Sequence, residues 1–349
     1  MIRNERVFDE EHVPDRLQHR DAECQFLAEA FEPALHGDQP HDVLVHGPHG
    51  VGKTVLTRHT FDQLHRRVDV QYAHVDAMGK STAGIVRATL QELGADPDLN
   101  AATEDLCLQL RERVDEPVIV VLDEGDDLPT TDALARLTDV PLLGVVPVVH
   151  DPDEWLARVD DKIRDALHGK TLELNRYSVP ELADILEPRV RGGLLTTVDR
   201  RYLEGIADHA VGQARKGIQT LRAAAKLAGQ RNCRVEAVPV DEAHQVALRR
   251  IRQANLNSLP FHHNVLYELI RDAGSLEPGE LHRRYEEVAE EVYRGRGSVP
   301  IGNRQRLHTL EKLESYELIE RAESQHDEHR VLDFEVESEL IDLSDILVQ

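Results

Sequence analysis

The feature that most constrains this chain is a glycine-rich loop that follows an apolar run and precedes a helical stretch. The run 42–46 (DVLVH) predicts a buried strand that leads directly into the loop. The loop fits the pattern G-x-x-x-x-G-K-[ST], in which backbone N–H groups and the next helix N-terminus surround phosphate oxygens. We therefore predict a nucleoside triphosphate site formed by Gly47, Pro48, His49, Gly50, Val51, Gly52, Lys53, Thr54 and Val55.

Four side chains of this predicted site have specific expected roles. Lys53 is expected to reach the β and γ phosphates, and Thr54 to ligate Mg²⁺. A second apolar run, 118–122 (VIVVL), ends in Asp123 and Glu124. Asp123 is expected to hold the Mg²⁺ through water, and Glu124 to polarise the attacking water. The two motifs together predict ATP or ADP and Mg²⁺ as cofactors.

Apolar runs in the first half of the chain predict an α/β fold, a parallel sheet flanked by helices. Runs this continuously apolar are typical of strands that are buried on both faces. From Ser178 onward the strand pattern stops, and Ser178 with Glu181 forms a capping box that begins a helix reaching Leu186. The expected strands are 42–46, 68–75, 118–122, 142–149 and 171–174, and further helices are expected at 200–209, 213–228 and 241–254.

The last third of the chain predicts a winged helix-turn-helix, because three helices precede two strands. The helices are expected at 262–273, 278–293 and 302–315, and the strands at 318–322 and 330–336 around the polar turn 323–329. The segment 255–260 is expected to be a linker. The predicted domains are a nucleotide-binding base (1–176), an all-helical lid (177–254) and a C-terminal winged helix (255–349).

The charge of the chain bears on its partners. There are 65 acidic and 41 basic residues, a formal charge of −24, and only seven of the basic residues are lysines. An acidic, lysine-poor surface is typical of proteins in molar salt, which indicates a halophilic source. Because the Debye length at 1 M salt is only ~3 Å, local charge is more informative there than the total.

One segment, 293–310, is locally basic, with four arginines and no acidic residue. Leu307, Leu310 and Leu313 are expected to face the core, which would leave polar side chains at the exposed start of the third helix. Helix N-terminal residues are those that enter the major groove of DNA. A solvated surface or a protein interface is the alternative. The predicted DNA-binding residues are Arg294, Arg296, Asn303, Arg304, Gln305, Arg306 and His308.

The order of these motifs resembles that of the AAA+ ATPases and, more narrowly, of the archaeal origin-recognition and cell-division-cycle replication initiators. The resemblance covers about residues 5–340 and rests on the motifs 13–20 (VPD…HR), 47–54, 122–124 (LDE) and 212–215 (GQAR), followed by the winged helix. It implies that Val13, Pro14 and Arg20 contribute to an adenine pocket. It also implies that Arg215 is a second sensor, reaching the γ-phosphate from the lid.

Two positions depart from the family pattern. The family carries a polar residue called the first sensor, usually asparagine, that orients water. At this position the present chain has His150. Where the family carries a trans-acting arginine, the best-matching residue is Lys162, with Arg164 two positions later. A lysine does not replace a planar bidentate donor. The sequence therefore predicts ATP binding. If ATP is hydrolysed, the expected catalytic residues are Glu124, Arg215 and His150, and we hypothesise that hydrolysis is slow or absent.

The resemblance implies an initiator that binds double-stranded origin DNA, further copies of itself and the replicative helicase. A DNA-binding regulator or paralogue without initiator activity is one alternative, and an AAA+ ATPase acting on a protein is another. The chain has no signal-peptide or membrane-spanning run, so a cytoplasmic, nucleoid-associated protein and no membrane partner are expected. Several histidines, His49 among them, lack the carboxylate-backed spacing of metal sites and are expected at the surface or in packing. Trp155 is expected to be a packing residue.

Overall fold

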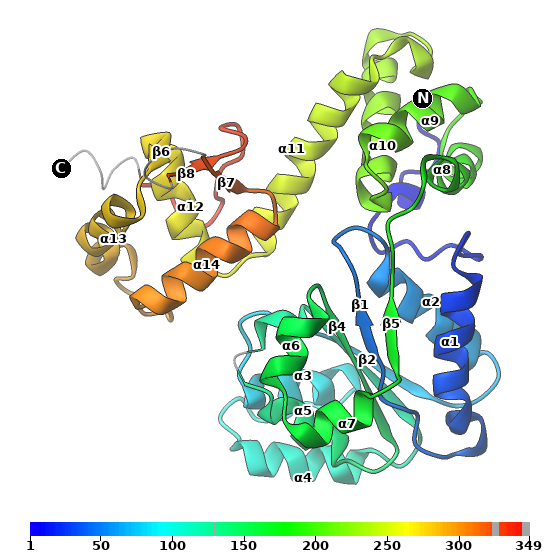
Figure 1. The fold of residues 1–349 in the computed structure, drawn as a ribbon, viewed down its shortest axis with the longest axis vertical. Helices are drawn as coiled ribbons and strands as arrows, with labels where there is room; N and C mark the ends of the chain where they lie inside the picture. The colour runs from blue at the N-terminus through cyan, green and yellow to red at the C-terminus, as the bar shows by residue number, and fades with distance from the viewer. Residues whose placement is uncertain (129, 323–327, 344–349) are drawn as a thin grey trace. The chain divides into compact units, whose positions relative to one another are not determined.

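The computed structural model describes residues 1–128, 130–322 and 328–343. These residues form two compact units, Met1–Val240 and Asp241–Gln349, here called the N-terminal and the C-terminal unit (Figure 1). The predicted base (1–176) falls within the N-terminal unit, whereas the predicted lid (177–254) extends past Val240 into the C-terminal unit. The predicted boundaries at 176/177 and 254/255 stay predictions.

The centre of the N-terminal unit is a five-stranded parallel sheet, as the apolar runs predict. Strand β4 is buried along its whole length and β3 along all but its last residue, which explains why their sequences are continuously apolar. The strand order β2-β3-β4-β1-β5 places β1, which leads into the glycine-rich loop, beside β4. The strands are β1 (Leu44–His46), β2 (Gln71–Asp76), β3 (Val118–Asp123), β4 (Leu143–Val149) and β5 (Thr171–Glu173).

Helices cover both faces of this sheet (Figure 1). One hydrophobic cluster joins the sheet to α1 (Asp21–Phe31) and α2 (Lys53–His65). A second cluster joins the other face to five helices and contains Trp155, which is buried as predicted. These helices are α3 (Thr82–Glu92), α4 (Thr103–Arg113), α5 (Asp132–Thr138), α6 (Pro152–Arg158) and α7 (Asp161–Leu167).

Three helices after the sheet form the lid: α8 (Val179–Gly193), α9 (Arg200–His209) and α10 (Ala214–Arg231). The predicted capping box of Ser178 and Glu181 is present, but α8 continues past Leu186 and includes Pro188. The N-terminal segment also packs on the lid. Phe8 is fully buried and lies so close to Gly193 that a Cβ there would collide with its ring. The lid therefore follows the last strand, β5, in the chain and also packs against the segment that precedes the first strand.

The C-terminal unit contains helices and a three-stranded antiparallel sheet of order β6-β8-β7. Strands β7 and β8 follow α14 as predicted, whereas the short strand β6, between α12 and α13, was not predicted. The prediction of a linker at 255–260 was wrong for its first residues, because α11 extends to Ser258 and the Asn255 side chain donates to the Tyr316 carbonyl. Within the predicted turn 323–329, residues 323–327 lie outside the described residues. The elements are α11 (Val240–Ser258), α12 (Phe261–Ala273), β6 (Ser275–Leu276), α13 (Pro278–Val292), α14 (Asn303–Ser315), β7 (Ile319–Arg321) and β8 (His329–Val331).

Candidate nucleotide site and basic helix

The glycine-rich loop has the backbone that its sequence predicts. Gly47, Gly50 and Gly52 have φ angles of 140°, 73° and 95°, which side-chain-bearing residues rarely adopt. A Cβ on Gly47 would also collide with the carbonyl oxygen of Leu174. The ammonium group of Lys53 donates to the loop carbonyls of Gly47, at 2.6 Å, and of Pro48, at 3.1 Å. Lys53 therefore lies inside the loop that would hold the phosphates.

The predicted Mg²⁺ ligands lie side by side. The Thr54 hydroxyl donates to Asp123 Oδ2 at 2.6 Å, so the loop and the end of β3 meet as expected. Two oxygen donors at this distance are the type of ligand that Mg²⁺ takes. His74, which the sequence reading missed, contacts the same carboxylate oxygen through Nε2 at 3.2 Å. It lies on β2, whose residues pair in register with β3.

The electrostatic setting of Asp123 favours its charged form. Burial raises the pKa of this carboxyl, but hydrogen bonds from His74 and Thr54 outweigh burial, so the net pKa lies below its usual value. Asp123 is therefore ionised at neutral pH and able to attract a cation.

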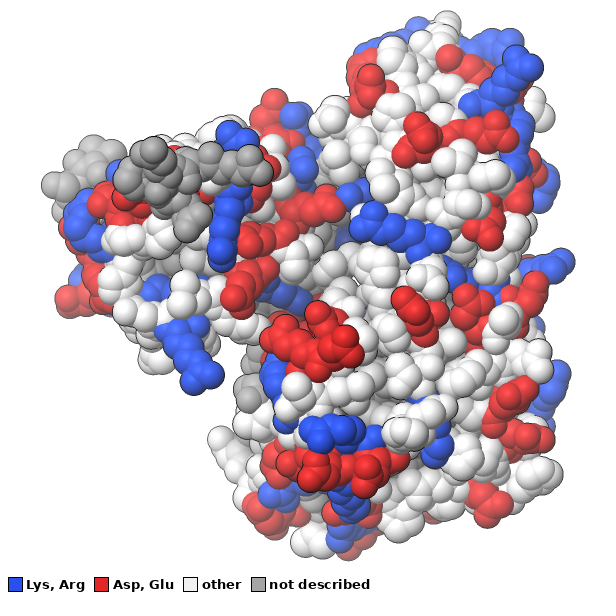
Figure 2. Space-filling view, viewed as in Figure 1, with Lys and Arg blue, Asp and Glu red and all other residues white. Residues whose placement is uncertain are grey.

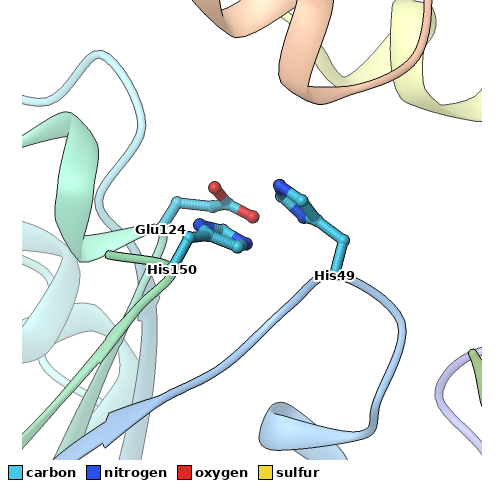
Figure 3. A group of neighbouring side chains, drawn as sticks. All are labelled: His49, Glu124 and His150. Atoms are coloured by element: carbon cyan, nitrogen blue, oxygen red, sulfur yellow. The ribbon is translucent and has the colours of Figure 1, made fainter. Parts of the chain in front are cut away.

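Glu124 and His150 lie together at the carboxyl ends of β3 and β4 (Figure 3). Glu124 has a φ of 53°, a left-handed conformation that is uncommon outside glycine. His150 Nδ1 lies 2.8 Å from Asp126 Oδ2, and the same oxygen accepts the His150 backbone N–H at 2.7 Å. The acidic run after β3 could have indicated Asp126, because carboxyl ends of neighbouring parallel strands lie at one edge of a sheet.

His49 joins these two side chains, which the sequence reading did not foresee. Its ring centroid lies 3.5 Å from that of His150. The metal-ligating atoms of His49, Glu124 and His150 all lie within 4.8 Å of one another. His49 is half-buried and packs on the His150 ring, which fits the expectation of a surface or packing histidine. Its closeness to Glu124 and His150 arises because the loop carries it to the end of β4, a contact that spacing along the chain cannot reveal.

A mostly apolar cavity lies between the loop, the N-terminal segment and the lid, where the resemblance implies an adenine pocket. Of the residues predicted for that pocket, Pro14 and Arg20 line the cavity, together with Val51, Gly52 and Val55 of the loop region. The lining includes residues the sequence reading missed, among them Leu17, Tyr177, Ile185, Ala214 and Ile218. Val13 is not among the lining residues.

Arg20 has a defined structural task at this cavity. Its side chain is buried and donates to the Tyr177 hydroxyl at 2.8 Å, the Asn175 carbonyl at 2.6 Å and Glu23 at 2.7 Å. The guanidinium also lies 4.1 Å from the centre of the Tyr177 ring. Arg20 thus joins the N-terminal segment to the connection between β5 and the lid.

Arg215, the predicted second sensor, lies beside the phosphate loop at the start of α10. Its backbone N–H donates to the Gly50 carbonyl at 3.1 Å, so the lid and the loop are hydrogen-bonded directly. Its Nε donates to Glu10 Oε1 at 2.7 Å. The side chain is thus held near the loop by a carboxylate.

The two residues considered for a trans-acting cation make contacts within their own chain. Lys162 forms an exposed ion pair with Asp139 at 2.5 Å. Arg164 donates to the carbonyls of Leu156 and Val159, both at 2.9 Å, which joins α6 to α7.

Helix α14 corrects the predicted DNA-binding face at one position. Arg306 is only 5% exposed, donates twice to Glu286 at 2.8 Å and lies over the Tyr285 ring, whereas Leu307 is 57% exposed. The core face of the helix therefore begins at Arg306 and continues through Thr309, Leu310 and Leu313. The reading of Leu307 as core and Arg306 as exposed was wrong, because it placed the helix face one residue too late.

The other predicted DNA-binding residues are exposed: Arg294, Arg296, Asn303, Arg304, Gln305 and His308. Arg296 lies over the Phe261 ring and donates to the Val292 carbonyl, so part of its hydrogen-bonding capacity is used within the chain. Acidic and basic residues are interspersed over the face seen in Figure 2. The exposed patch on α14 carries Arg304 and His308 together with the acidic Glu311, so its charge is mixed.

Comparisons with known proteins agree with this fold. Residues 16–146 match the family described as AAA ATPase domain. The chain is 29% identical to ORC1-type DNA replication protein 9 of Halobacterium salinarum, over 83% of this chain and 84% of that protein. It is also 29% identical to ORC1-type DNA replication protein 1 of that organism, over 82% of this chain and 95% of the relative.

A solved structure matches across both units. The structure of the Aeropyrum pernix ORC1 protein in complex with DNA has a TM-score of 0.74 and 26% identity, and covers 95% of this chain and 93% of that one. A glycine-rich phosphate loop, the Asp123–Glu124 pair and a helical lid on a five-stranded parallel sheet define an AAA+ ATPase fold. Within that class, the chain is similar along most of its length to archaeal ORC1-type DNA replication proteins. Among the described residues, no helix is long and apolar enough to cross a membrane.

Proposed function

We propose that this chain is an ATP-dependent origin-recognition protein that binds duplex DNA and takes part in the initiation of DNA replication. The observation that carries this proposal is the match to the Aeropyrum pernix ORC1 protein in complex with DNA, which spans the nucleotide-binding and the C-terminal unit together. The relatives in Halobacterium salinarum carry the name of DNA replication proteins. Such a protein acts at the nucleoid, in the cytoplasm.

The residues around the loop fit a nucleotide with Mg²⁺. Lys53 would hold the β and γ phosphates, while Thr54 and Asp123 would hold the cation, whose charge offsets that of the phosphates. The apolar cavity with Pro14 and Val55 suits a purine base, and the buried Arg20 shapes its wall. Glu124 would orient and polarise water.

The lid gives the nucleotide a route to change the conformation of the N-terminal unit. The Arg215 guanidinium pairs with Glu10, and a γ-phosphate would compete with that carboxylate for it. Transfer of Arg215 from Glu10 to the phosphate would couple the lid to the nucleotide state.

DNA binding would use the exposed start of α14. Asn303, Arg304 and Gln305 have side chains suited to base edges and phosphates, and all three are exposed. At high salt, counterion release contributes little, so hydrogen-bonded base contacts and shape should dominate the affinity. Further copies of this chain and the replicative helicase are the other proposed partners.

The second candidate function is a DNA-binding regulator or paralogue that holds ATP without acting as an initiator. The observation that favours it is His150 at the first-sensor position, in contact with Asp126 rather than free to orient water as an asparagine would. An ATPase that acts on a protein partner is the third alternative.

Genome-wide occupancy of the tagged protein separates these functions, with a Lys53→Ala strain and a Lys170→Ala control strain beside it. Lys170 precedes β5 at the opposite end of the sheet from the loop. A few sharp Lys53-dependent peaks at replication start sites are expected. Many promoter peaks would favour the regulator, and no enrichment would favour the protein-directed ATPase.

Hydrolysis is tested separately in multimolar KCl. Steady-state turnover of the wild type should be slow, and Glu124→Gln should abolish what remains while leaving ATP binding intact. Turnover of many cycles per minute that is lost in Glu124→Gln would reject the hypothesis of slow hydrolysis.

A further inference from the structure

Three metal-ligating side chains from three separate segments converge beside the phosphate loop. His49 comes from the loop, Glu124 follows β3, and His150 follows β4 (Figure 3). Their ligating atoms lie within 4.8 Å of one another, and all three side chains are half-buried. Partial exposure gives an ion a path to the cluster, while the sheet edge keeps the three groups together.

We propose that His49, Glu124 and His150 bind a divalent transition-metal ion, with Zn²⁺ as the reference ion, when no nucleotide is bound. Two imidazoles and one carboxylate are a donor set that suits Zn²⁺ and related ions. Mg²⁺ takes oxygen ligands and fits the Thr54 and Asp123 pair instead. Adjacent residues, Asp123 and Glu124, thus belong to two cation sites of different chemistry.

Asp126 prepares His150 for this role. Its carboxylate lies 2.8 Å from His150 Nδ1 and also accepts the His150 backbone N–H, so the ring is held in a fixed orientation. A proton on Nδ1 leaves Nε2 with the lone pair that a metal requires. Histidine ligands in metal sites commonly have such a carboxylate behind them. This contact is an observation independent of the clustering itself.

The turn that carries Glu124 is also held firmly. The Trp155 indole N–H donates to the Gly125 carbonyl at 3.0 Å, and Glu124 is fixed in a left-handed conformation. Around a tetrahedral Zn²⁺, bond lengths of about 2.0–2.2 Å separate the ligand atoms by roughly 3.3–3.6 Å. The three side chains would therefore move by about 1 Å to close on an ion, leaving a fourth position open to water.

Metal binding at this cluster would oppose nucleotide turnover. An ion held by Glu124 occupies the carboxylate that polarises water, and His49 belongs to the loop that wraps the phosphates. This consequence rests on the proposed ATPase function, whereas metal binding itself does not.

The test uses the full-length chain, freed of nucleotide and metal, in concentrated KCl. Zn²⁺ is titrated against a chromogenic chelator, with wild type compared to His49→Ala and His150→Ala. One tight site is expected in the wild type, and its affinity should fall at least tenfold in each variant. Asp126→Asn should weaken it by about 10–100-fold, the usual effect of losing a carboxylate behind a ligating histidine. His41→Ala, an exposed histidine outside the cluster, is the matched control.

Co²⁺ gives a second readout that does not depend on affinity alone. Its visible absorption on the wild-type chain should change in His49→Ala and His150→Ala and remain the same in His41→Ala, with circular dichroism confirming that each variant is folded. Equal Zn²⁺ affinity and equal Co²⁺ spectra in the wild type and a His49→Ala/His150→Ala double variant would overturn the proposal, since the remaining histidines would then account for binding.

The regulatory consequence has its own arm. ATP binding measured without metal tests the proposed nucleotide function, and Zn²⁺ binding measured without nucleotide tests the cluster, so a failure of one is distinct from a failure of the other. Pre-bound Zn²⁺ should lower the ATP affinity of the wild type and leave that of the double variant unchanged. Equal effects of Zn²⁺ on both proteins would overturn the claimed competition.

Discussion

The phosphate loop and the exposed face of α14 are both expected to bind phosphate-bearing ligands, yet they are built on different principles. The loop depends on backbone geometry, with three glycines at positive φ and Lys53 bonded to loop carbonyls. The α14 face depends on a few exposed side chains on a regular helix. In the loop a single buried ammonium group, that of Lys53, supplies the side-chain charge, so replacing this one residue should remove much of the affinity. A site made by side chains loses affinity in small steps.

The largest effect is therefore expected in the loop. Lys53→Ala should weaken ATP binding about 30-fold or more, because removing one partner of a buried charge pair costs about 2–5 kcal/mol. Calorimetric titration with ATP in concentrated KCl checks this, with Lys170→Ala as the control. A loss of less than about tenfold would mean that the loop binds through its backbone and Mg²⁺ alone.

The next effect tests the corrected face of α14. Arg306→Ala should lower the free energy of unfolding by about 2 kcal/mol, since it removes a buried guanidinium packed on Tyr285 and bonded to Glu286. Arg304 is exposed and lies two residues before Arg306. Arg304→Ala should leave the free energy of unfolding within about 0.5 kcal/mol of the wild-type value. Urea unfolding measures both. Equal stabilities of the two variants would restore the original reading of Arg306 as a surface residue.

DNA binding is then compared between variants of two exposed arginines, Arg304 and Arg294. Arg304→Ala should weaken duplex binding about fivefold, roughly 1 kcal/mol, as expected for one polar contact to a base edge or phosphate. Fluorescence anisotropy with an origin duplex and a scrambled duplex measures the loss. Arg294→Ala gives a second exposed arginine of the same segment. Unchanged binding in both variants would favour a protein partner for this patch.

The smallest effect lies at the edge of the nucleotide region, where the N-terminal segment docks on the lid. Lys226 and Arg222 hold the pKa of the Glu5 carboxyl at about 2, below its usual 4.5. A lowered pKa means that this contribution to stability is complete above about pH 4.5 and is lost as pH falls toward about 2. The group is exposed, so Glu5→Gln should cost less than about 1 kcal/mol at neutral pH.

Urea unfolding at a series of pH values checks the Glu5 prediction at fixed salt. The stability difference between wild type and Glu5→Gln should shrink as the pH is lowered through that window. A difference that stays constant with pH would show that the ion pairs with Lys226 and Arg222 do not stabilise the lid.

The two regions also differ in how far the sequence predicted them. The loop motif and the acidic end of the second apolar run predict that Thr54 and Asp123 share a cation site. The structure places the Thr54 hydroxyl 2.6 Å from Asp123 Oδ2. The α14 face was read from charge and leucine spacing, and a one-residue shift exchanged Arg306 with Leu307. The strands and helices of the sheet were predictable because continuous apolar runs report burial directly. The cluster of His49 with His150 was not, because it depends on which strands become neighbours, and β1 pairs with β4 across about a hundred residues.

The backbone hydrogen bond from Arg215 to the Gly50 carbonyl has a consequence for how this chain can diverge in evolution. A bond between main-chain atoms survives replacement of the Arg215 side chain, with proline at 215 as the exception. A lineage could therefore lose the Arg215 guanidinium and with it direct sensing of the γ-phosphate, yet keep the loop and the lid joined. Descendants that have stopped hydrolysing ATP could in this way retain a lid that still follows occupancy of the loop.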